Sequence, residues 1–313
     1  MLTLTSIQDV ESKPSSDIDV LIVACGYEGR ARAAAQEFHT TAKSKLAIGF
    51  SSQRELEYEA NKAWFESAGF DLVEVGDNEF RAALEQYLLP RAQGDGVRKV
   101  EVDISCFNRF RLAHLVDVLR TLSASEVTVI FRYSIAKFTP PVEDTAPTVS
   151  VEPVIPQFAG WTTRPDRPPA AIVGLGYEPN KAIGIVDHLE INNATWAYYP
   201  LGPIPEYYQR VLEGNRSLLN IIQADGRCQP YDLDEPAQLF HEINSLVDML
   251  KPHFNTVLIP FGPKLFALVT LLVASLNDDV GVWRVSSGSL EEPVNREPSG
   301  HIVSVSATFR DAP

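Results

Sequence analysis

The sequence predicts an α/β fold of two tandem Rossmann-like units, each a mainly parallel five-stranded sheet with helices on both faces. Short apolar, β-branched runs alternate with segments of helical periodicity, and this alternation is typical of parallel strands joined by right-handed crossovers. The alternation starts again in the second half, where the tripeptide Gly-Tyr-Glu of residues 26–28 recurs at residues 176–178. The closing strands also match, because Ile130–Ser134 reads I-F-R-Y-S and Val282–Ser286 reads V-W-R-V-S. The sequence therefore predicts an internal duplication.

The first unit is assigned to residues 1–150. Its first strand is predicted at Ile18–Ala24, an unbroken apolar run that indicates a strand covered on both faces. Its fourth strand runs from Val100 to Asp103, and leucines and valines at three- and four-residue spacing predict a helix after it. Residues 1–17 are polar and rich in serine, so we expect a loosely held arm there. The remaining elements are predicted as helices at 28–39, 53–68 and 78–89 and strands at 46–50, 71–75 and 127–133.

A proline-rich stretch, residues 137–169, separates the two predicted units. Proline removes a backbone donor and disfavours a helix, so we expect an extended linker with an edge strand at residues 148–154. The second unit is assigned to residues 151–313, and its elements follow in the same order as those of the first. They are predicted as a strand from residue 170, strands at 195–199, 230–233, 256–260 and 280–285, and helices at 180–190, 205–222, 236–250 and 265–276. One further strand is predicted at 301–306.

The composition indicates a soluble globular chain and argues against several classes of function. The 41 acidic and 27 basic residues give a net charge of −14, which disfavours a long nucleic acid as partner because such binders concentrate Lys and Arg. Three scattered cysteines argue against a disulfide framework and favour a reducing cytoplasm. No signal peptide is recognisable, and the longest apolar run is shorter than the roughly 20 residues that span a bilayer. We therefore expect a cytoplasmic protein without a membrane partner.

The two Gly-Tyr-Glu turns are the first candidate ligand-binding positions. Gly26 and Gly176 each follow the first strand of a unit, where a glycine allows a sharp turn and brings backbone N–H groups close to an anion. The adjacent Tyr27 and Tyr177 are included in the predicted ligand-binding set. The alternative is that the glycine only makes a tight turn and the glutamate after it complements the helix dipole.

These turns do not fit the common nucleotide-cofactor sites. The third glycine of the dinucleotide fingerprint is absent, and no acidic residue closes the second strand of either half, where one would bind a ribose. The phosphate loop of nucleotidases is also absent, so no cofactor is expected, and no Cys/His cluster suggests a metal. If the protein is an enzyme, which the sequence leaves open, Glu28 and Glu178 are the candidates for a catalytic base.

The second candidate position is the motif Asp103-x-Ser105-x-x-x-Arg109 at the end of the fourth strand. Ser105 can donate to a phosphate, and the guanidinium of Arg109 offers a planar fork for a phosphate or a base edge. Asp103 can orient the arginine or accept from a ribose hydroxyl. The alternative is that Ser105 or Asn108 caps the next helix and that Arg109 is a solvated helix residue.

A cation stands at the same offset in the second unit. Lys264 lies six residues after Leu258, as Arg109 lies six residues after Asp103, and it follows a turn at Gly262 that exposes backbone amides. A duplicated fold would place the two cationic turns around one shared anion cleft, related by a pseudo-two-fold axis.

The second helix of each half supplies a weaker echo, in which Tyr58 and Asn61 of the first half correspond to Tyr208 and Asn215 of the second. Asn61 and Asn215 occupy comparable places in these helices, although the register is poorer. An aromatic cluster, which could stack a base or pack in the core, is formed by Tyr198, Tyr199, Tyr207 and Tyr208.

The pattern of strand, [Asp/Asn]-x-[Ser/Thr]-x-x-x-[Arg/Lys] and helix resembles the CARF domain, the sensor of cyclic oligoadenylates in CRISPR and related antiphage systems. The first half matches it at Asp103, Ser105 and Arg109, and the second half keeps only the cation, Lys264. The resemblance implies that each half corresponds to one CARF protomer and that the chain builds internally the symmetric pocket which the family makes by dimerising. It leaves no residues for a nuclease-type effector domain, so a partner protein would supply the response.

Three functional hypotheses follow. The first is a sensor that binds a nucleotide-type ligand, a cyclic oligonucleotide or related small anion, between the two halves and signals to a partner in antiphage defence. The second is a nucleotide-processing hydrolase or transferase on the same scaffold, with Glu28 or Glu178 as general base. The third is a structural subunit of a complex, in which the repeated glycines and cations serve only the fold.

Overall fold

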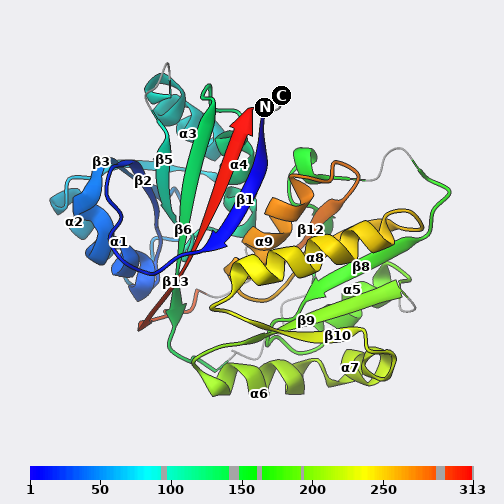
Figure 1. Ribbon diagram of the computed structural model, residues 1–313. Helices are drawn as coiled ribbons and strands as arrows, with labels where there is room; N and C mark the ends of the chain where they lie inside the picture. Colours follow the sequence, from blue (N-terminus) through cyan, green and yellow to red (C-terminus); the bar gives the residue numbers. More distant parts are fainter. Residues whose placement is uncertain (93–96, 141–147, 161–163, 192–193, 287–292, 312–313) are drawn as a thin grey trace. The chain divides into compact units, whose positions relative to one another are not determined.

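The structure is a computed structural model that describes residues 1–92, 97–140, 148–160, 164–191, 194–286 and 293–311 (Figure 1). The chain forms two compact units. Unit 1 consists of residues 1–137 and 292–313, and unit 2 consists of residues 138–291. We expected the chain to divide at residue 150. In the structure the first boundary lies after residue 137, and the last segment of the chain belongs to unit 1.

Unit 1 is built on a seven-stranded sheet. The strands are β1 (Leu2–Asp9), β2 (Ile18–Cys25), β3 (Ala42–Phe50), β4 (Asp71–Val75), β5 (Lys99–Asp103), β6 (Glu126–Ala136) and β13 (Pro298–Asp311). Their order across the sheet is β1-β13-β6-β5-β2-β3-β4, and the five strands from β6 to β4 pair in parallel. Almost every residue of β2 and β5 is buried, as the unbroken apolar run of β2 predicts for a strand covered on both faces.

The two outer strands of this sheet come from opposite ends of the chain. β13 pairs antiparallel with β6, and β1 pairs antiparallel with β13. The prediction of a loose arm that includes residues 2–9 was therefore wrong. The strand predicted at 301–306 lies within β13, but it belongs to unit 1 and not to the second unit. Leu2, Leu4 and Ile7 are buried and the residues between them are more exposed, so β1 buries one face only. This alternation is the signal in the sequence that identifies the strand.

Helices cover both faces of the sheet of unit 1. They are η1 (Gly29–Arg32), α1 (Ala33–Phe38), η2 (His39–Thr41), α2 (Tyr58–Ser67), α3 (Asp77–Arg91) and α4 (Arg109–Arg120). Ala35 of α1 and Phe65 of α2 join the buried core formed with β2 and β3. Phe80 of α3 meets Phe107, just before α4, with ring centroids 5.8 Å apart and nearly perpendicular planes. The chain moves along the sheet from β2 to β4 through α1 and α2, and back from β4 to β6 through α3 and α4. Right-handed crossovers in these opposite directions place α3 and α4 on the other face from α1 and α2.

Unit 2 repeats this architecture with a six-stranded sheet. Its strands are β7 (Ser150–Pro153), β8 (Pro169–Gly174), β9 (Thr195–Leu201), β10 (Cys228–Asp232), β11 (Asn255–Pro260) and β12 (Gly281–Ser286). Their order is β10-β9-β8-β11-β12-β7, with the first five parallel. β7 pairs antiparallel with β12, which confirms the edge strand predicted in the proline-rich stretch.

The helices of unit 2 match the predicted order, with one break. They are η3 (Pro156–Phe158), α5 (Lys181–His188), α6 (Pro205–Gly214), α7 (Arg216–Ile222), η5 (Gln223–Asp225), α8 (Pro236–Leu250) and α9 (Lys264–Ala274). The single helix predicted at 205–222 is interrupted at Asn215, whose φ of −112° and ψ of 13° are not helical. Across the described parts of the chain, none of the helices is long and apolar enough to cross a membrane.

Both units have the strand order of a Rossmann-like sheet. In each unit the five parallel strands, numbered along the chain, stand in the order third, second, first, fourth, fifth. This confirms the predicted α/β class of two Rossmann-like units, although both sheets are larger than the five strands expected. The order reverses between the first and fourth strands, and ligands of such sheets bind outside the carboxyl ends of the strands at this switch point. The switch point lies between β2 and β5 in unit 1 and between β8 and β11 in unit 2.

Candidate functional site

The two sequence motifs of unit 1 meet at its switch point. Val23 of β2 is in register with Asp103, the last residue of β5, and Gly26 directly follows β2. A Cβ on Gly26 would lie 3.0 Å from the Cβ of Cys106, which is tighter than nine in ten real contacts. Residue 26 is therefore a glycine because the two turns approach each other closely. Tyr27, beside it, is half-buried.

Glu28 belongs to a buried ion-pair network inside unit 1. Its carboxylate accepts from Nε of Arg30 at 2.5 Å and from Nη1 of Arg296 at 3.2 Å, and both Glu28 and Arg30 are at most 5% exposed. Arg30 also donates to the backbone carbonyl of Ser134 at 2.9 Å. Burial alone would lower the pKa of Arg30, but the adjacent Glu28 carboxylate raises it well above its ordinary value. This carboxylate thus fixes the turn to two cations of the same unit.

Asp103 and Ser105 shape the turn after β5. Oδ1 of Asp103 accepts from the backbone N–H of Ser105 at 2.9 Å, and Oγ of Ser105 accepts from the backbone N–H of Ser134 at 2.8 Å. Ser105 is fully buried and Asp103 is 3% exposed. The seryl oxygen therefore joins this turn to β6, a role that the sequence motif did not suggest.

Asn108 caps helix α4, the alternative role that the sequence allowed for it. Its Oδ1 accepts from the backbone N–H of Arg111 at 2.8 Å, and its Nδ2 donates to Asp77 at 2.9 Å. The sequence did not single out Arg111, because an arginine in the first turn of a helix normally faces solvent. It is fully buried and donates to Asp77 at 2.7 Å and to the carbonyls of Gly49 and Val75 at 3.0 and 2.7 Å. This side chain ties α4 to the ends of β3 and β4.

Arg109 and Lys264 occupy equivalent places in their own units. Arg109 is the first residue of α4 and Lys264 the first residue of α9, and each helix follows the fourth parallel strand of its unit. Both residues are half-buried. A cation in the first turn of a helix opposes the helix dipole by about 0.3–1 kcal/mol, and an anion bound beside it removes that cost.

In unit 2 the turns after β8 and β11 are hydrogen-bonded to each other. The backbone N–H groups of Phe261 and Gly262 both donate to the carbonyl of Gly174, at 2.9 and 3.1 Å. A Cβ on Gly262 would lie 2.6 Å from the backbone carbonyl oxygen of Leu175, in the turn after β8. A Cβ on Gly176 would collide with the carboxylate of Glu178. Glycine is required at residue 262 because a backbone carbonyl approaches it closely, and at residue 176 it leaves room for the Glu178 carboxylate. The Glu178 carboxylate therefore lies over the Gly-Tyr-Glu turn of this unit.

Tyr177 stands in a group of aromatic rings beside this turn. Its ring centroid lies 5.7 Å from that of Tyr207 at an interplanar angle of 33°, and the ring of Phe138 meets Tyr207 edge to face at 5.1 Å. All three residues are half-buried. Tyr198 lies instead in the core against Phe266, where burial raises the pKa of its hydroxyl to about 12. The structure thus divides the predicted tyrosine cluster and adds Phe138, which the sequence did not single out.

Each Gly-Tyr-Glu turn is held by an asparagine from the second helical segment of its unit. Nδ2 of Asn61 donates to the carbonyls of Gly26 and Glu28, both at 2.9 Å. Nδ2 of Asn215 donates to the carbonyl of Gly176 at 2.7 Å. Both side chains are buried. The echo noticed in the sequence is therefore a structural equivalence, and it strengthens the inference of duplication.

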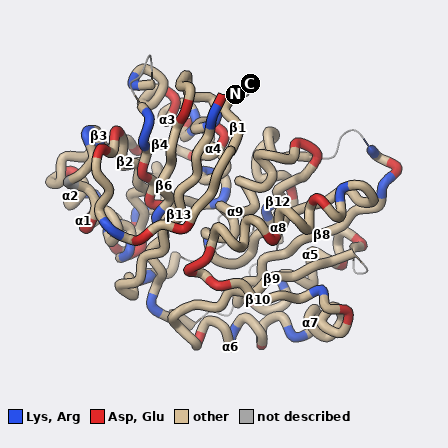
Figure 2. Tube along the Cα trace, in the orientation of Figure 1, with Lys and Arg blue, Asp and Glu red and all other residues tan. Residues whose placement is uncertain are grey.

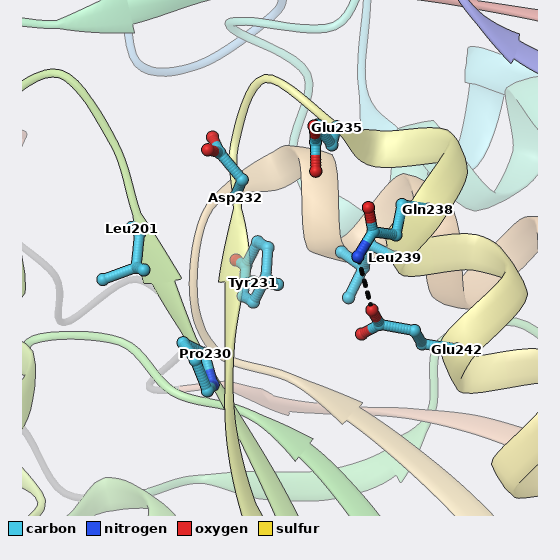
Figure 3. Close-up of a pocket in the computed structure, with 8 residues that line it drawn as sticks. All are labelled: Leu201, Pro230, Tyr231, Asp232, Glu235, Gln238, Leu239 and Glu242. Carbon is cyan, nitrogen blue, oxygen red and sulfur yellow. Dashed lines mark hydrogen bonds between the residues drawn. The ribbon is translucent and has the colours of Figure 1, made fainter.

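A hollow of about 190 Å³ lies in unit 2 between the end of β10 and the start of α8 (Figure 3). Asp232, Glu235 and Glu242 stand around it, and Glu242 accepts from Nε2 of Gln238 at 2.9 Å. Its described lining holds three carboxylates and no basic side chain, so it repels a phosphate group. The remaining lining residues are Leu201, Pro230, Tyr231 and Leu239.

The described residues contain no arrangement of His, Cys, Asp and Glu that could hold a metal ion. Cys25 lies in the core of unit 1, where burial raises the pKa of its thiol to about 12. A thiol of this kind does not act as a nucleophile near neutral pH. Cys25 is therefore a packing residue.

Charged residues are scattered along the trace of both units (Figure 2). A scan against models of protein families finds none that matches the chain, and a search of curated proteins likewise finds no match.

Proposed function

We propose that the protein senses a nucleotide-type ligand, a cyclic oligonucleotide or a related small anion, at the carboxyl edges of its Rossmann-like units. One observation carries the proposal. In each unit a glycine turn after the first parallel strand lies beside the turn after the fourth, and a cation, Arg109 or Lys264, begins the helix that follows. The resemblance to the CARF domain supports the same class of ligand, a role in antiphage defence and a partner protein that responds.

The electrostatics of this arrangement favour a small anion. Backbone N–H groups at a helix start attract negative charge, and a half-buried cation at the same place adds to that attraction. Arg109 adds a planar fork that can take two phosphate oxygens at once, and Lys264 adds a compact point charge. In either unit a small ligand can bind beside such a cation without the extended basic surface that a long nucleic acid needs.

Unit 2 also offers a place for the base of a nucleotide. The half-buried rings of Tyr177 and Tyr207 stand next to the turn of Gly176, which lies beside the turn of Gly262 and Lys264. An aromatic ring can stack on a nucleobase whatever its hydrogen-bonding pattern, so the cation and the rings together suit a phosphate and a base of one ligand.

A nucleotide-processing hydrolase or transferase is the second candidate function. Glu28 is engaged by two arginines, so Glu178, whose carboxylate lies over the glycine turn of unit 2, is the candidate that this function favours as general base. Under this function Glu178→Gln should retain nucleotide binding and lose product formation, as measured by chromatography of the nucleotide after incubation.

A thermal-shift panel of linear and cyclic adenine nucleotides tests the sensor proposal. A nucleotide present at 100 times its Kd stabilises the protein by about 2.7 kcal/mol, which raises Tm measurably. Lys264→Ala and Arg109→Ala should each reduce the rise in Tm caused by the best nucleotide, whereas Lys43→Ala, at an exposed ion pair with Asp19, should leave it unchanged. The proposal is wrong if no nucleotide raises the Tm of the wild type, or if both variants respond as the wild type does.

A further inference from the structure

Residues 295–297, directly before β13, contact the turn that follows β2, which is the first turn of unit 1 after a parallel strand. We call them the strap. Oδ1 of Asn295 accepts from the backbone N–H of Gly29 at 2.8 Å, and the backbone carbonyl of Arg296 accepts from the N–H of Arg30 at 3.0 Å. The first two backbone donors of helix η1 are thus both bound to oxygens of the strap.

The strap also brings a negative charge to this turn. The carboxylate oxygens of Glu297 lie 2.6 and 2.7 Å from the position that a Cβ on Gly29 would take, so a side chain at residue 29 would displace them. Oε1 of Glu297 accepts from Nδ2 of Asn295 at 3.0 Å, and its backbone carbonyl accepts from the N–H of Lys137 at 2.8 Å. The strap is thereby fixed to the end of β6 as well as to the turn.

These contacts reproduce what a phosphate receives in a Rossmann-like unit. A phosphate there accepts from the backbone N–H groups after the first strand and approaches a glycine closely, because no side chain stands in the way. In unit 1 the strap supplies the accepting oxygens, and Glu297 supplies the charge.

We propose that the strap is a built-in occupant of the first turn of unit 1, which closes this turn to anions and leaves ligand exchange at this kind of turn to unit 2. The assignment of ligand exchange to unit 2 rests on the proposed function. The closure of unit 1 does not, and it can be tested without the nucleotide. The repeated Gly-Tyr-Glu turns therefore differ in what lies over them: in unit 1 it is the strap, from far along the chain, and in unit 2 it is the side chain of Glu178, a residue of the turn itself.

Hydrogen–deuterium exchange of the peptide of residues 28–33 tests the closure. The double variant Asn295→Ala, Glu297→Gln should exchange about tenfold faster than the wild type, because the N–H of Gly29 loses its acceptor and the strap loses its internal hydrogen bond. Arg310→Ala, which removes an exposed ion pair at the far end of β13, should exchange as the wild type does. Millimolar inorganic pyrophosphate should leave the exchange of this peptide in the wild type unchanged.

Two results would overturn the closure: equal exchange of the peptide in the double variant and the wild type, or slower exchange in the wild type when pyrophosphate is added. Thermal melts followed by circular dichroism show whether the double variant is folded. If it is not, Asn295→Ala alone, which removes the acceptor of the Gly29 N–H and keeps Glu297, should still show faster exchange. A failure of the sensor proposal appears elsewhere, as the absence of any nucleotide response or as a response that depends on neither Arg109 nor Lys264.

Discussion

Asn215 donates a hydrogen bond of 2.7 Å from its side chain to the carbonyl of Gly176, as Asn61 does to the carbonyl of Gly26 at 2.9 Å. Each bond crosses from the second helical segment of a unit to the turn after its first parallel strand. A buried carbonyl needs a donor, and the turn cannot supply one while it bends sharply toward the neighbouring strand. The asparagine therefore preserves the shape of the turn in both units, and in unit 2 the helix is interrupted at this residue.

Replacing Asn61 should weaken unit 1 substantially. Asn61→Ala removes the donor to two carbonyls, those of Gly26 and Glu28, in a fully buried place, so we expect a loss of about 2–3 kcal/mol in the free energy of unfolding. Urea denaturation measures this loss. Gln36→Ala, on the exposed face of α1, is the control and should change the free energy by less than about 0.5 kcal/mol. Equal stability of the two variants would contradict the structural role of Asn61.

Glu74 should make the stability of unit 1 depend on acid pH. Hydrogen bonds from Tyr58 and Lys62 lower the pKa of Glu74 below its ordinary value of about 4.3. Because the folded-state pKa is the lower one, the stabilisation is present above the unfolded value and is lost as the pH falls through the folded value. Glu74→Gln should therefore cost about 1 kcal/mol at pH 7 and much less near pH 3.

Urea denaturation at both pH values measures this difference for Glu74→Gln. Glu37→Gln, at an exposed position of α1, is the matched control and should show the same stability as the wild type at both. A cost of Glu74→Gln that stays constant between the two pH values would show that the carboxylate charge is not what stabilises the site.

Cys25 should resist alkylation in the folded protein. At a pKa of about 12, its thiolate fraction near pH 8 is roughly a thousandfold below that of an ordinary cysteine, and the side chain is buried as well. Iodoacetamide labelling followed by peptide mass spectrometry should find Cys25 unmodified until denaturant is added. Cys228, which is half-buried, is the internal comparison and should be labelled first. Early labelling of Cys25 in the native protein would mean that its part of the core opens readily.

The ring of Tyr177 should contribute to nucleotide binding. Stacking of one base on an aromatic side chain is worth about 1–3 kcal/mol, so Tyr177→Ala should weaken binding of the nucleotide that raises Tm most by about tenfold or more. Tyr177→Phe keeps the ring and should retain most of the affinity. Isothermal titration calorimetry measures both. Equal affinity of Tyr177→Ala and the wild type would remove the aromatic group from the proposed site.

Much of the fold could be predicted because its parallel strands and helices are local patterns. The bounds of β4 at Asp71–Val75 and of α8 at Pro236–Leu250 agree with the sequence prediction to the residue. The outer strands could not be placed in this way, because the pairing of β1 with β13 joins the two ends of the chain. Nothing in a local window indicates which distant segment will satisfy the backbone of an edge.

The candidate site shows the same division. The meeting of the Gly26 turn with the turn after Asp103 follows from the strand order of a Rossmann-like sheet, the fold class that the alternation of strands and helices predicts. The engagement of Glu28 with Arg296, or of Ser105 with the backbone of Ser134, depends on residues far away in the sequence. A motif therefore predicts where a side chain lies, but the residue that binds this side chain is known only from the tertiary structure.

The position of β13 has a consequence for biosynthesis. This strand is translated after all of unit 2, yet it covers the edge of β6, which is translated before unit 2. On the ribosome, the sheet of unit 1 therefore keeps an unpaired edge at β6 until unit 2 and then β13 have been synthesised. A stalled chain would expose that edge to other proteins. Synthesis of unit 1 therefore begins before that of unit 2 and ends after it.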